Sequence, residues 1–411
     1  MKDFGRSDDP EVQAQLDRLA ALSVPQGRLG LETTSAMMER LGNPHRKLPP
    51  VFHVAGTNGK GSTCAFLRAM LEAQGYKVHV TISPHLVRYN ERIRIAGELI
   101  SDEELASVLK EVLDACEDLG PSFFEVTIAA AFLAFSRTPA DACVVEVGMG
   151  GRFDATNVLE PDVLAACGIA ALGLDHERFL LAPEDGVPKE PMARIAFEKA
   201  GIAKKGVPVV TITHPKTESD AIGAVATRIG SLLITASPCV NMPLALTGNH
   251  QRENAGLAVT MLRSQSRISI SDQAIQQGLI SAYWPARMQK LSPGPLVGDR
   301  QVWLDGGHNP SAGKVIAEEI AGDVHLILGM LDNKDPTAIT GPLGDRVRTL
   351  TVVPVPNHDS HPVQAFGQDA RASANVEEAL MNLPPDGYPV LIAGSLYLAG
   401  EVLRLNDEIP T

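Results

Sequence analysis

The sequence predicts an α/β protein with more than one domain. Short runs of β-branched residues alternate with Ala- and Leu-rich helical patterns over most of the chain, which is typical of parallel strands joined by crossover helices. At roughly 100–200 residues per domain, a length of 411 residues allows two or three domains. A hydrophobic fraction of 44% and a charged fraction of 21% are those of a globular protein with a large core.

The N-terminal part carries the clearest strand and helix patterns. Strands are expected at residues 50–55, 77–82, 141–147 and 163–169, with a helix at 63–74. Ser101 and Glu104 have the spacing of a capping box, which predicts a further helix running toward Asp118.

A domain boundary is expected at residues 291–300, where two prolines and two glycines interrupt the pattern. The chain is therefore divided into domains 1–290 and 291–411. Strands expected beyond the boundary lie at 302–305, 324–328, 349–353 and 390–393, and they alternate with helical patterns. The second domain is thus expected to be a smaller, open, Rossmann-like α/β sheet.

The charge, the cysteines and the N-terminus narrow the class of protein. The formal net charge of −13 argues against nucleic acid as the main partner. Five scattered cysteines without CxxC spacing indicate core residues in a reducing compartment. The N-terminus is polar and acidic, and the later apolar runs are too short to span a bilayer. We expect a soluble cytoplasmic protein.

Residues 51–63 (VFHVAGTNGKGST) predict a nucleotide-binding loop. Glycines let backbone N–H groups close on phosphate oxygens, and Lys60 can reach the β- and γ-phosphates. The spacing departs from the strict Walker pattern, because Val54 replaces the first glycine and Gly61 replaces the Ser or Thr after the lysine. The alternative is a glycine-rich surface turn. The favoured interpretation makes the first domain a P-loop-type parallel sheet.

Three candidate Mg²⁺ ligands stand at the ends of predicted strands: Ser83, Glu146 and His176. Strand ends in parallel sheets gather at one edge, so these residues can converge there. Taken singly, each also suits a structural role, as a turn former, a solvated strand end and a helix-start residue. Glycines after Glu146 let the backbone approach a ligand, and Arg152 could meet an anion. The arginines of 88–94 form a basic cluster or a solvated loop.

A set of rare motifs then resembles the folylpolyglutamate synthase and dihydrofolate synthase group of the Mur ligase superfamily. The motifs occur in the family's order between residues 51 and 312 and cover most of the chain. They are HVAGTNGKGST, SPHLVRYNERIR, SFFEVT, EVGMGGRFDATN, LDH, IAFEKAGIAK, NHQRENA, WPARMQ and LDGGHNPSA.

The resemblance implies an ATP-dependent amide ligase that adds L-glutamate to a pterin carboxylate. In the family, ATP phosphorylates the carboxylate of dihydropteroate, or the γ-carboxylate of a folate, and the glutamate amine then displaces phosphate. The implied ligands are ATP, Mg²⁺ (two ions), dihydropteroate, reduced folates and L-glutamate. A monomer is expected, with neither nucleic acid nor membrane as a partner.

Site residues also follow from the resemblance. The implied contacts to ATP are Asn58, Gly59, Lys60, Gly61, Ser62, Asn254, Arg287 and Asp305; the implied Mg²⁺ ligands are Ser83, Glu146, His176 and Lys199; and the implied catalytic residues are Lys60, His176 and Lys199. Lys199 matches a lysine that the family carries as a carbamate, an anionic metal ligand. The alternative interpretation of Lys199 is an exposed helix lysine. The alternative for Arg287 is a charged residue of the linker, and the alternative for Asp305 is a strand-end cap.

The implied substrate contacts are Ser122, Phe123, Phe124, Glu125, Arg152, Phe153 and His308. Aromatic rings offer a flat face to a pterin, although core packing would also explain Phe123 and Phe124. Because Asp305 ends a strand of the second domain, nucleotide is expected between the domains. One segment departs from the family: between His176 and Glu198 the chain is longer and Pro-rich and lacks an LG-x-T element.

Three other functions are alternatives to this ligase. Folylpolyglutamate synthase activity alone would need the same residues. A cell-wall ligase of the Mur type usually has Thr directly after the loop lysine, where this chain has Gly61. A P-loop nucleotide switch would not need LDGGHNP and WPARMQ in a second domain.

Overall fold

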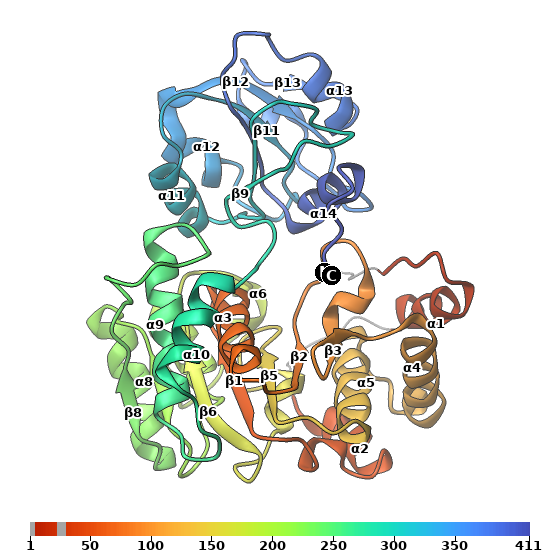
Figure 1. Ribbon diagram of the computed structural model, residues 1–411, viewed down its shortest axis with the longest axis vertical. Coiled ribbons are helices and arrows are strands. Elements are labelled where there is room, and N and C mark those ends of the chain that lie inside the picture. The colour runs from red at the N-terminus through yellow and green to blue at the C-terminus, as the bar shows by residue number, and fades with distance from the viewer. Residues whose placement is uncertain (1–4, 23–29) are drawn as a thin grey trace. The chain divides into compact units, whose positions relative to one another are not determined.

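The computed structural model describes residues 5–22 and 30–411, and the chain divides into two compact units (Figure 1). The first unit is Met1–Tyr283 and the second is Trp284–Thr411. The division lies shortly before residue 291, where the sequence pattern placed the domain boundary. The first four residues of the polar N-terminus lie outside the described part of the chain.

The first unit is built on an eight-stranded sheet in the order β4-β3-β2-β5-β1-β6-β7-β8. Along this order, every neighbouring pair between β2 and β8 is parallel. The strands β3 and β4 are added antiparallel beside β2. With β1 between β5 and β6, the carboxyl ends of these strands meet at one edge. The strands are β1 (Val51–Ala55), β2 (Val78–Thr81), β3 (Ile93–Ile95), β4 (Glu98–Leu99), β5 (Ala142–Glu146), β6 (Leu164–Ile169), β7 (Val209–Thr211) and β8 (Leu233–Thr235).

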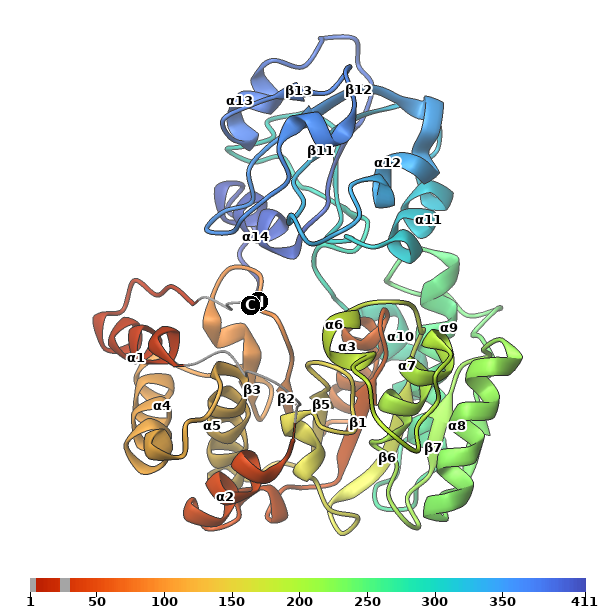
Figure 2. The ribbon, with the colours of Figure 1, turned by 180° about the vertical axis from the view of Figure 1, so that it is seen from behind.

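Helices cover both faces of this sheet, so its central strands are continuously buried. On one face α3 and α9 pack on the strands with α10 against α3 (Figure 1), and α7 is seen from the other side (Figure 2). The larger core joins the strands to α1, α4, α5, α7 and α8. The helices are α1 (Pro10–Ala21), α2 (Glu32–Arg40), α3 (Lys60–Ala73), α4 (Asp102–Cys116), α5 (Phe123–Arg137), α6 (Glu177–Leu180), α7 (Pro191–Ala200), α8 (Lys216–Ile229), α9 (Asn249–Arg263) and α10 (Asp272–Ser281).

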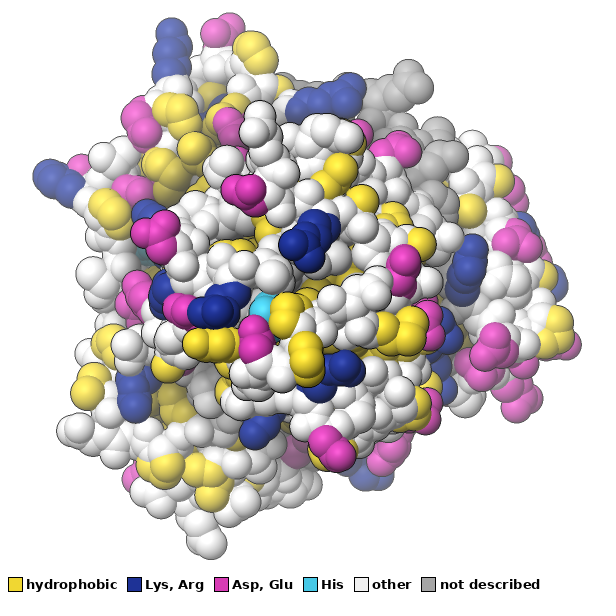
Figure 3. Space-filling view, turned by 90° about the horizontal axis from the view of Figure 1, so that it is seen from above, with side chains coloured by type: hydrophobic (Ala, Val, Ile, Leu, Met, Phe, Trp, Pro, Cys, Tyr) yellow, Lys and Arg dark blue, Asp and Glu magenta, His cyan; other side chains and the backbone are white. Residues whose placement is uncertain are grey.

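The second unit has a six-stranded sheet in the order β13-β12-β11-β14-β10-β9, parallel except for β9. A separate core joins β11 and β14 to α11 and α12. On the face shown in Figure 3, acidic and basic side chains are interspersed. The elements are β9 (Gln289–Lys290), β10 (Val302–Leu304), α11 (Pro310–Glu319), β11 (Val324–Leu328), α12 (Thr337–Leu343), β12 (Val347–Val352), β13 (Arg371–Ala372), α13 (Val376–Met381), β14 (Val390–Ala393) and α14 (Leu396–Leu405).

The structure confirms the α/β class and every strand expected from the sequence. Ser101 caps α4 as expected, because its Oγ accepts a bond of 3.1 Å from Glu104 N. The helix expected at 63–74 begins earlier, at Lys60, since Gly59 turns the chain directly from the loop into α3. No helix formed by the described residues combines the length and apolar character needed to cross a membrane.

Candidate functional site

The loop between β1 and α3 is fastened to the segment that follows β6. Thr57 N and Asn58 N both donate to Ala171 O, at 2.8 and 3.1 Å. The Thr57 hydroxyl donates to Gly173 O at 2.9 Å and accepts from Gly173 N at 3.0 Å. These bonds fix the loop at the carboxyl edge of the sheet, the edge at which parallel α/β folds bind ligands.

The turn into α3 requires glycine and brings Asn254 to the loop. Gly59 has a φ of 82°, and a Cβ at this position would lie 2.3 Å from Asn254 Oδ1. Asn254 Nδ2 donates to Gln251 Oε1 at 3.0 Å, and Gln251 Nε2 donates to Ser62 Oγ at 3.2 Å. The motif NHQRENA therefore lies beside the loop, and its Gln251 is a site residue that the sequence analysis missed.

The N-terminus of α3 is suited to bind an anion. Lys60 and Gly61 are its first residues, and Gly59 supplies no side-chain cap. The first N–H groups of a helix have no partner within the helix, and the helix dipole adds partial positive charge there. Lys60 Nζ lies 3.5 Å from Thr57 O, so its ammonium stays at the loop. The segment therefore has the backbone and charge of a phosphate-binding loop.

Ser83 and Glu146 meet beside this loop although 63 positions separate them in sequence. Ser83 N donates to Glu146 Oε2 at 3.2 Å, and Glu146 Oε1 lies 4.0 Å from Lys60 Nζ. The Glu146 side chain is only 5% exposed. The interpretation of Glu146 as a solvated strand end is therefore wrong.

Lys199 is buried beneath the loop rather than exposed on a helix surface. Its side chain is 4% exposed, and Nζ donates to Gly56 O at 2.9 Å. Burial lowers the pKa of the Lys199 amine to about 7, and the nearby Lys60 ammonium lowers it too. The interpretation as an exposed helix lysine is wrong.

His176 begins α6 in a left-handed backbone conformation, with a φ of 53°. Its side chain is 35% exposed, and Nε2 lies 3.9 Å from Asp175 Oδ2. This is the helix-start position that the structural interpretation gave it. Its assignment as a metal ligand stays a prediction.

The donor types at this edge suit Mg²⁺. Glu146 offers carboxylate oxygens, and Ser83, held against it by its backbone bond, carries a hydroxyl. Oxygen donors of this kind are those that Mg²⁺ prefers. Within residues 5–22 and 30–411, no three His, Cys, Asp or Glu side chains form a group that could hold a metal ion. A magnesium site here would therefore need oxygens from substrate or water besides Glu146 and Ser83.

The glycine turn after β5 packs closely on two expected site elements. A Cβ on Gly148 would lie 2.3 Å from the Phe124 ring, and one on Gly151 would lie 2.9 Å from Lys199 O. Phe123 and Phe124 are half-buried. The rings of Phe123 and Tyr89 pack edge to face, with 5.9 Å between the ring centres. Packing thus buries part of each of these two aromatic side chains and leaves the rest exposed.

Ser122 and Glu125 form the capping box that starts α5. Ser122 N and Oγ both donate to Glu125 Oε2 at 2.8 Å, and Thr34 Oγ1 donates to Glu125 Oε1 at 2.9 Å. The Glu125 carboxylate therefore holds α2 to the start of α5. Contact of these residues with substrate stays a prediction.

The arginines of residues 88–94 do not form one solvated loop. Arg88 is exposed, but the Arg92 side chain is fully buried. Arg92 Nε donates to His85 Nδ1 at 2.8 Å, and its guanidinium lies 5.4 Å from the centre of the Phe123 ring. Burial, followed by the charge of Arg92, holds the pKa of His85 well below its ordinary value.

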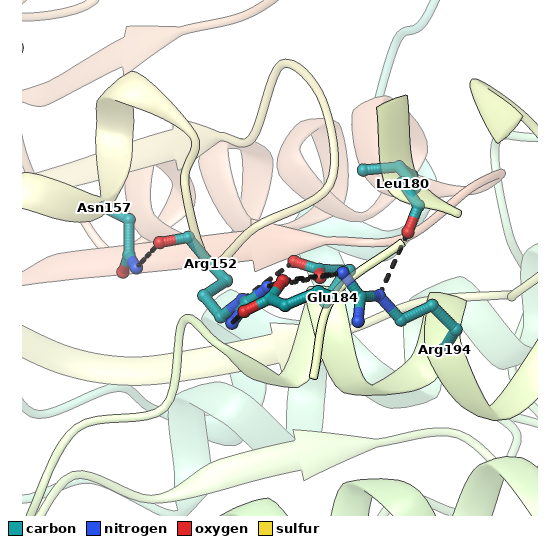
Figure 4. A network of polar contacts seen from close by, with 6 residues as sticks. Arg152, Asn157, Leu180, Glu184 and Arg194 are labelled. Carbon is teal, nitrogen blue, oxygen red and sulfur yellow. Dashed lines mark hydrogen bonds and ion pairs between the residues drawn. The ribbon is translucent and has the colours of Figure 1, made fainter. Parts of the chain in front are cut away.

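Arg152 and Phe153 lie at the end of the same glycine turn. The Arg152 guanidinium is ion-paired with Glu184 and Glu198 (Figure 4) and lies 4.2 Å from the centre of the Phe153 ring. Both side chains are half-buried. Arg152 thus has two acidic partners of its own, and its contact with a substrate anion stays a prediction.

In the second unit, Asp305 directly follows β10 and holds two backbone segments. Its carboxylate accepts from Met288 N at 2.8 Å and from Gly307 N at 2.7 Å. Burial raises the pKa of Asp305, while the charge of Arg287 opposes this. The expected strand-end role is thus present, and a contact with ATP stays a prediction, as it does for Arg287.

His308 and Asn309 follow in the same motif. The two atoms His308 Nδ1 and Gly306 O are 3.1 Å apart, and the imidazole is half-buried. Asn309 caps α11 by accepting a 2.9 Å bond from Ala312 N. The sequence LDGGHNP is therefore a strand-to-helix junction that presents a histidine next to a helix N-terminus.

Together, these features define a nucleotide-binding α/β protein with a phosphate loop in its first unit, followed along the chain by a second α/β unit. No protein-family model matches the chain. The chain is 36% identical over 323 residues to dihydrofolate synthase/folylpolyglutamate synthase of Bacillus subtilis, covering 70% of this chain and 71% of that protein. It is 32% identical over 410 residues to folylpolyglutamate synthase of Lacticaseibacillus casei, covering 89% and 92%.

A solved structure extends the likeness to both units. It is a bifunctional folylpolyglutamate synthase/dihydrofolate synthase of Yersinia pestis complexed with AMPPNP and Mn ion. The TM-score is 0.82 at 28% identity, and the match covers 98% of this chain and 99% of that one. The chain belongs to the dihydrofolate synthase/folylpolyglutamate synthase family, as the sequence motifs indicated.

Proposed function

We propose that the protein is an ATP-dependent ligase that forms an amide between L-glutamate and a pterin or folate carboxylate. It acts on dihydropteroate and on the γ-carboxylate of folates through an acyl phosphate. The observation that carries this proposal is the convergence of Lys60, Glu146 and Lys199 on one loop, in a member of this family. We propose both activities because the Bacillus subtilis relative is named for both, dihydrofolate synthase and folylpolyglutamate synthase.

The chain's own groups suit the phosphoryl-transfer step. The N-terminus of α3 and the Lys60 ammonium would bind the β- and γ-phosphates and oppose the charge that develops on them. Asn254 and the Gly59 turn shape the loop around the nucleotide. Glutamate amine would then attack the acyl carbon, the C–N bond would form, and inorganic phosphate would leave.

Ser83, Glu146, His176 and a carbamylated Lys199 are the residues we assign to Mg²⁺, with two ions expected. Bound Mg²⁺ would neutralise phosphate charge during transfer. Burial of Lys199 against Gly56 O supports a structured role for this side chain. A carbamate would turn the amine into an oxygen ligand.

We assign the pterin to Ser122, Phe123, Phe124, Glu125 and Phe153, and anionic parts of the substrates to Arg152 and His308. Arg287 and Asp305 are assigned to ATP. Half-buried aromatic rings support the pterin assignment, because their remaining faces are accessible to a flat heterocycle. We divide these roles between domains 1–290 and 291–411.

We place the protein in the cytoplasm as a monomer. Free cysteines support the first assignment, since reduced thiols are typical of that compartment. Light scattering on the purified protein tests the second.

The function is tested by offering dihydropteroate and tetrahydrofolate separately, each with ATP and L-glutamate, and by identifying the products. Both acceptors should gain one glutamate, and ATP turnover should rise when acceptor and glutamate are added together. If tetrahydrofolate gains glutamate and dihydropteroate does not, the proposed function is reduced to folylpolyglutamate synthase activity. ATP turnover that ignored both substrates would contradict the ligase and favour a nucleotide switch.

A further inference from the structure

Residues 177–190, a segment within the stretch between His176 and Glu198, are fastened over the glycine turn after β5. We call this segment the strap. It starts with α6, where the Leu180 side chain is buried. A Cβ on Gly150 would lie only 2.8 Å from Leu180 Cδ2, so the strap rests directly on the turn.

Glu184 binds the strap to two arginines from different elements (Figure 4). Its carboxylate accepts from both Nη1 and Nη2 of Arg152, the first at 3.0 Å, and from Arg194 Nη2 at 2.8 Å. Arg152 belongs to the glycine turn and Arg194 to α7. Paired N–H donors on one carboxylate define orientation as well as distance.

Glu198, which belongs to α7, completes the network. It accepts from Arg152 Nε at 3.0 Å and Nη2 at 2.8 Å, and its Oε1 lies 2.9 Å from Arg194 Nη2. Two cations and two anions thus alternate in a site where each side chain is at most 20% exposed. In such a site, loss of one partner leaves the others buried and incompletely paired.

The network is continuous with backbone contacts that hold Lys199. Arg152 N donates to Glu198 O at 2.8 Å, and a Cβ on Gly151 would lie 2.9 Å from Lys199 O. The turn and α7 therefore touch without space for a side chain. The orientation of α7, which carries Lys199 to Gly56, depends on this contact.

The network also reaches the start of the strap. Arg194 Nε donates to Leu180 O at 3.1 Å, which ties α7 to the end of α6. His176 is the N-cap residue of that one-turn helix. Arg194 is thus connected to His176 on one side and, along α7, to Lys199 on the other.

We propose that Glu184 and Arg194 are positioning residues, which lock the strap and thereby hold Lys199 at the phosphate loop and His176 at the start of α6. Both act through Arg152, Glu198 and the backbone of α6 and α7. The proposal rests on the roles proposed for His176 and Lys199.

The test compares Glu184→Gln, Arg194→Met and the double variant with Asp185→Asn, which alters an exposed acid next to Glu184. Hydrogen exchange of residues 195–202 measures the order of α7 without any ligand. Steady-state kinetics give kcat, KM for L-glutamate and the Mg²⁺ concentration for half-maximal rate. Circular dichroism gives the folded fraction, so that kcat is expressed per folded molecule.

We expect faster exchange in α7, a kcat lower by roughly 10- to 100-fold and a higher Mg²⁺ requirement, the range typical of groups that orient metal ligands. The control Asp185→Asn should match the parent protein in exchange, kcat and KM for L-glutamate. The double variant should lose no more than the worse single variant, because both act on one network. Glu184→Asp, which keeps the charge, should recover part of kcat.

Unchanged exchange, or a kcat per folded molecule within twofold of the parent in Glu184→Gln, would overturn the positioning role. Additive losses in the double variant would also overturn it. Lys199→Ala separates this failure from failure of the proposed function. If Lys199→Ala is inactive while Glu184→Gln is normal, only the strap proposal fails; if Lys199→Ala is fully active, the proposed role of Lys199 fails.

Discussion

Lys199 illustrates how burial decides the chemistry of a side chain. In sequence it is one lysine of a helical segment, and surface helix lysines are common. In the structure it is 4% exposed, bonded to Gly56 O and close enough to Lys60 for the two charges to oppose each other. A buried amine in that position is expensive to keep charged, which favours its modification or its use in the reaction.

Replacing Lys199 with Ala should abolish amide formation, because the variant removes the proposed carbamate and with it an anionic metal ligand. The fold should stay intact. Short carboxylic acids should restore part of the activity by supplying the missing oxygens. Amide product is measured with and without added acetate, with Lys205→Ala, an exposed lysine nearby, as the control. Full activity of Lys199→Ala without any acid would falsify the carbamate proposal.

His53, in the middle of β1, sets a pH dependence of stability. Burial, and to a lesser extent Lys204, lowers the pKa of this imidazole to about 3, and Nε2 lies 2.8 Å from Thr156 Oγ1. The unfolded chain takes up a proton below about pH 6.5, whereas the folded chain stays neutral. The stability contributed by neutral His53 is therefore fully present above pH 6.5 and falls as the pH drops toward 3.

Between pH 7.5 and 5.5, the free energy of unfolding should fall in the parent protein by about 1.4 kcal/mol more than it falls in His53→Leu. The comparison between the two proteins removes the contribution of the other histidines. Urea unfolding followed by far-UV circular dichroism measures it. An identical pH dependence in both proteins would show that His53 does not titrate as its burial requires.

At the scale of elements, α3 is fixed by close packing as well as by its loop. Gly278 of α10 faces the α3 backbone, and a Cβ there would lie 2.4 Å from both the N and Cα of Met70. Backbone atoms cannot move aside as a flexible side chain can. The position of the phosphate loop therefore depends on a glycine more than two hundred residues away in sequence.

Gly278→Ala should lower the free energy of unfolding by about 1–3 kcal/mol, because it overpacks the contact between α3 and α10. Gly223→Ala is the matched control, since a Cβ at Gly223 in α8 has no heavy atom within 4 Å. The control should gain roughly 0.5–1 kcal/mol from helix propensity. Urea unfolding measures both, and equal effects of the two variants would contradict the packing argument.

Strands were predictable at this scale, and several helix details were not. The buried runs at 51–55, 142–146, 164–169 and 324–328 stand out because both faces of the sheets are covered. The start of α3 was misplaced by three residues, since it depends on the left-handed Gly59 rather than on periodicity. The short edge strands β4, β9 and β13 carry two residues each, too few for a pattern.

At the scale of the whole molecule, the net charge of −13 does not attract the proposed substrates, which are themselves anionic. Charges of both signs are interspersed on the face in Figure 3. Binding must then depend on local cations, such as Lys60 at the N-terminus of α3. Among the residues that we assign to ligands, Lys60 and Lys199 belong to the first unit, and Asp305 and His308 belong to the second.

The different roles assigned to Lys60 and His308 predict separable defects. His308→Ala should lower amide formation by about tenfold or more, the loss expected for one hydrogen bond to a charged group, and leave nucleotide affinity unchanged. Lys60→Ala should lose nucleotide affinity instead. Calorimetric titration with a non-hydrolysable ATP analogue and product assays measure the two effects, and loss of nucleotide binding in His308→Ala would contradict the assignment.

The sequence by itself determined the α/β class, the phosphate loop and the family, because these depend on local runs such as VFHVAGTNGKGST and on rare motifs. The tertiary structure decided which residues meet. It placed Ser83 on Glu146, Lys199 under Gly56, Gln251 on Ser62 and Glu184 between Arg152 and Arg194. Such contacts join residues from different elements, and burial, which sets their charge states, exists only once those elements have packed.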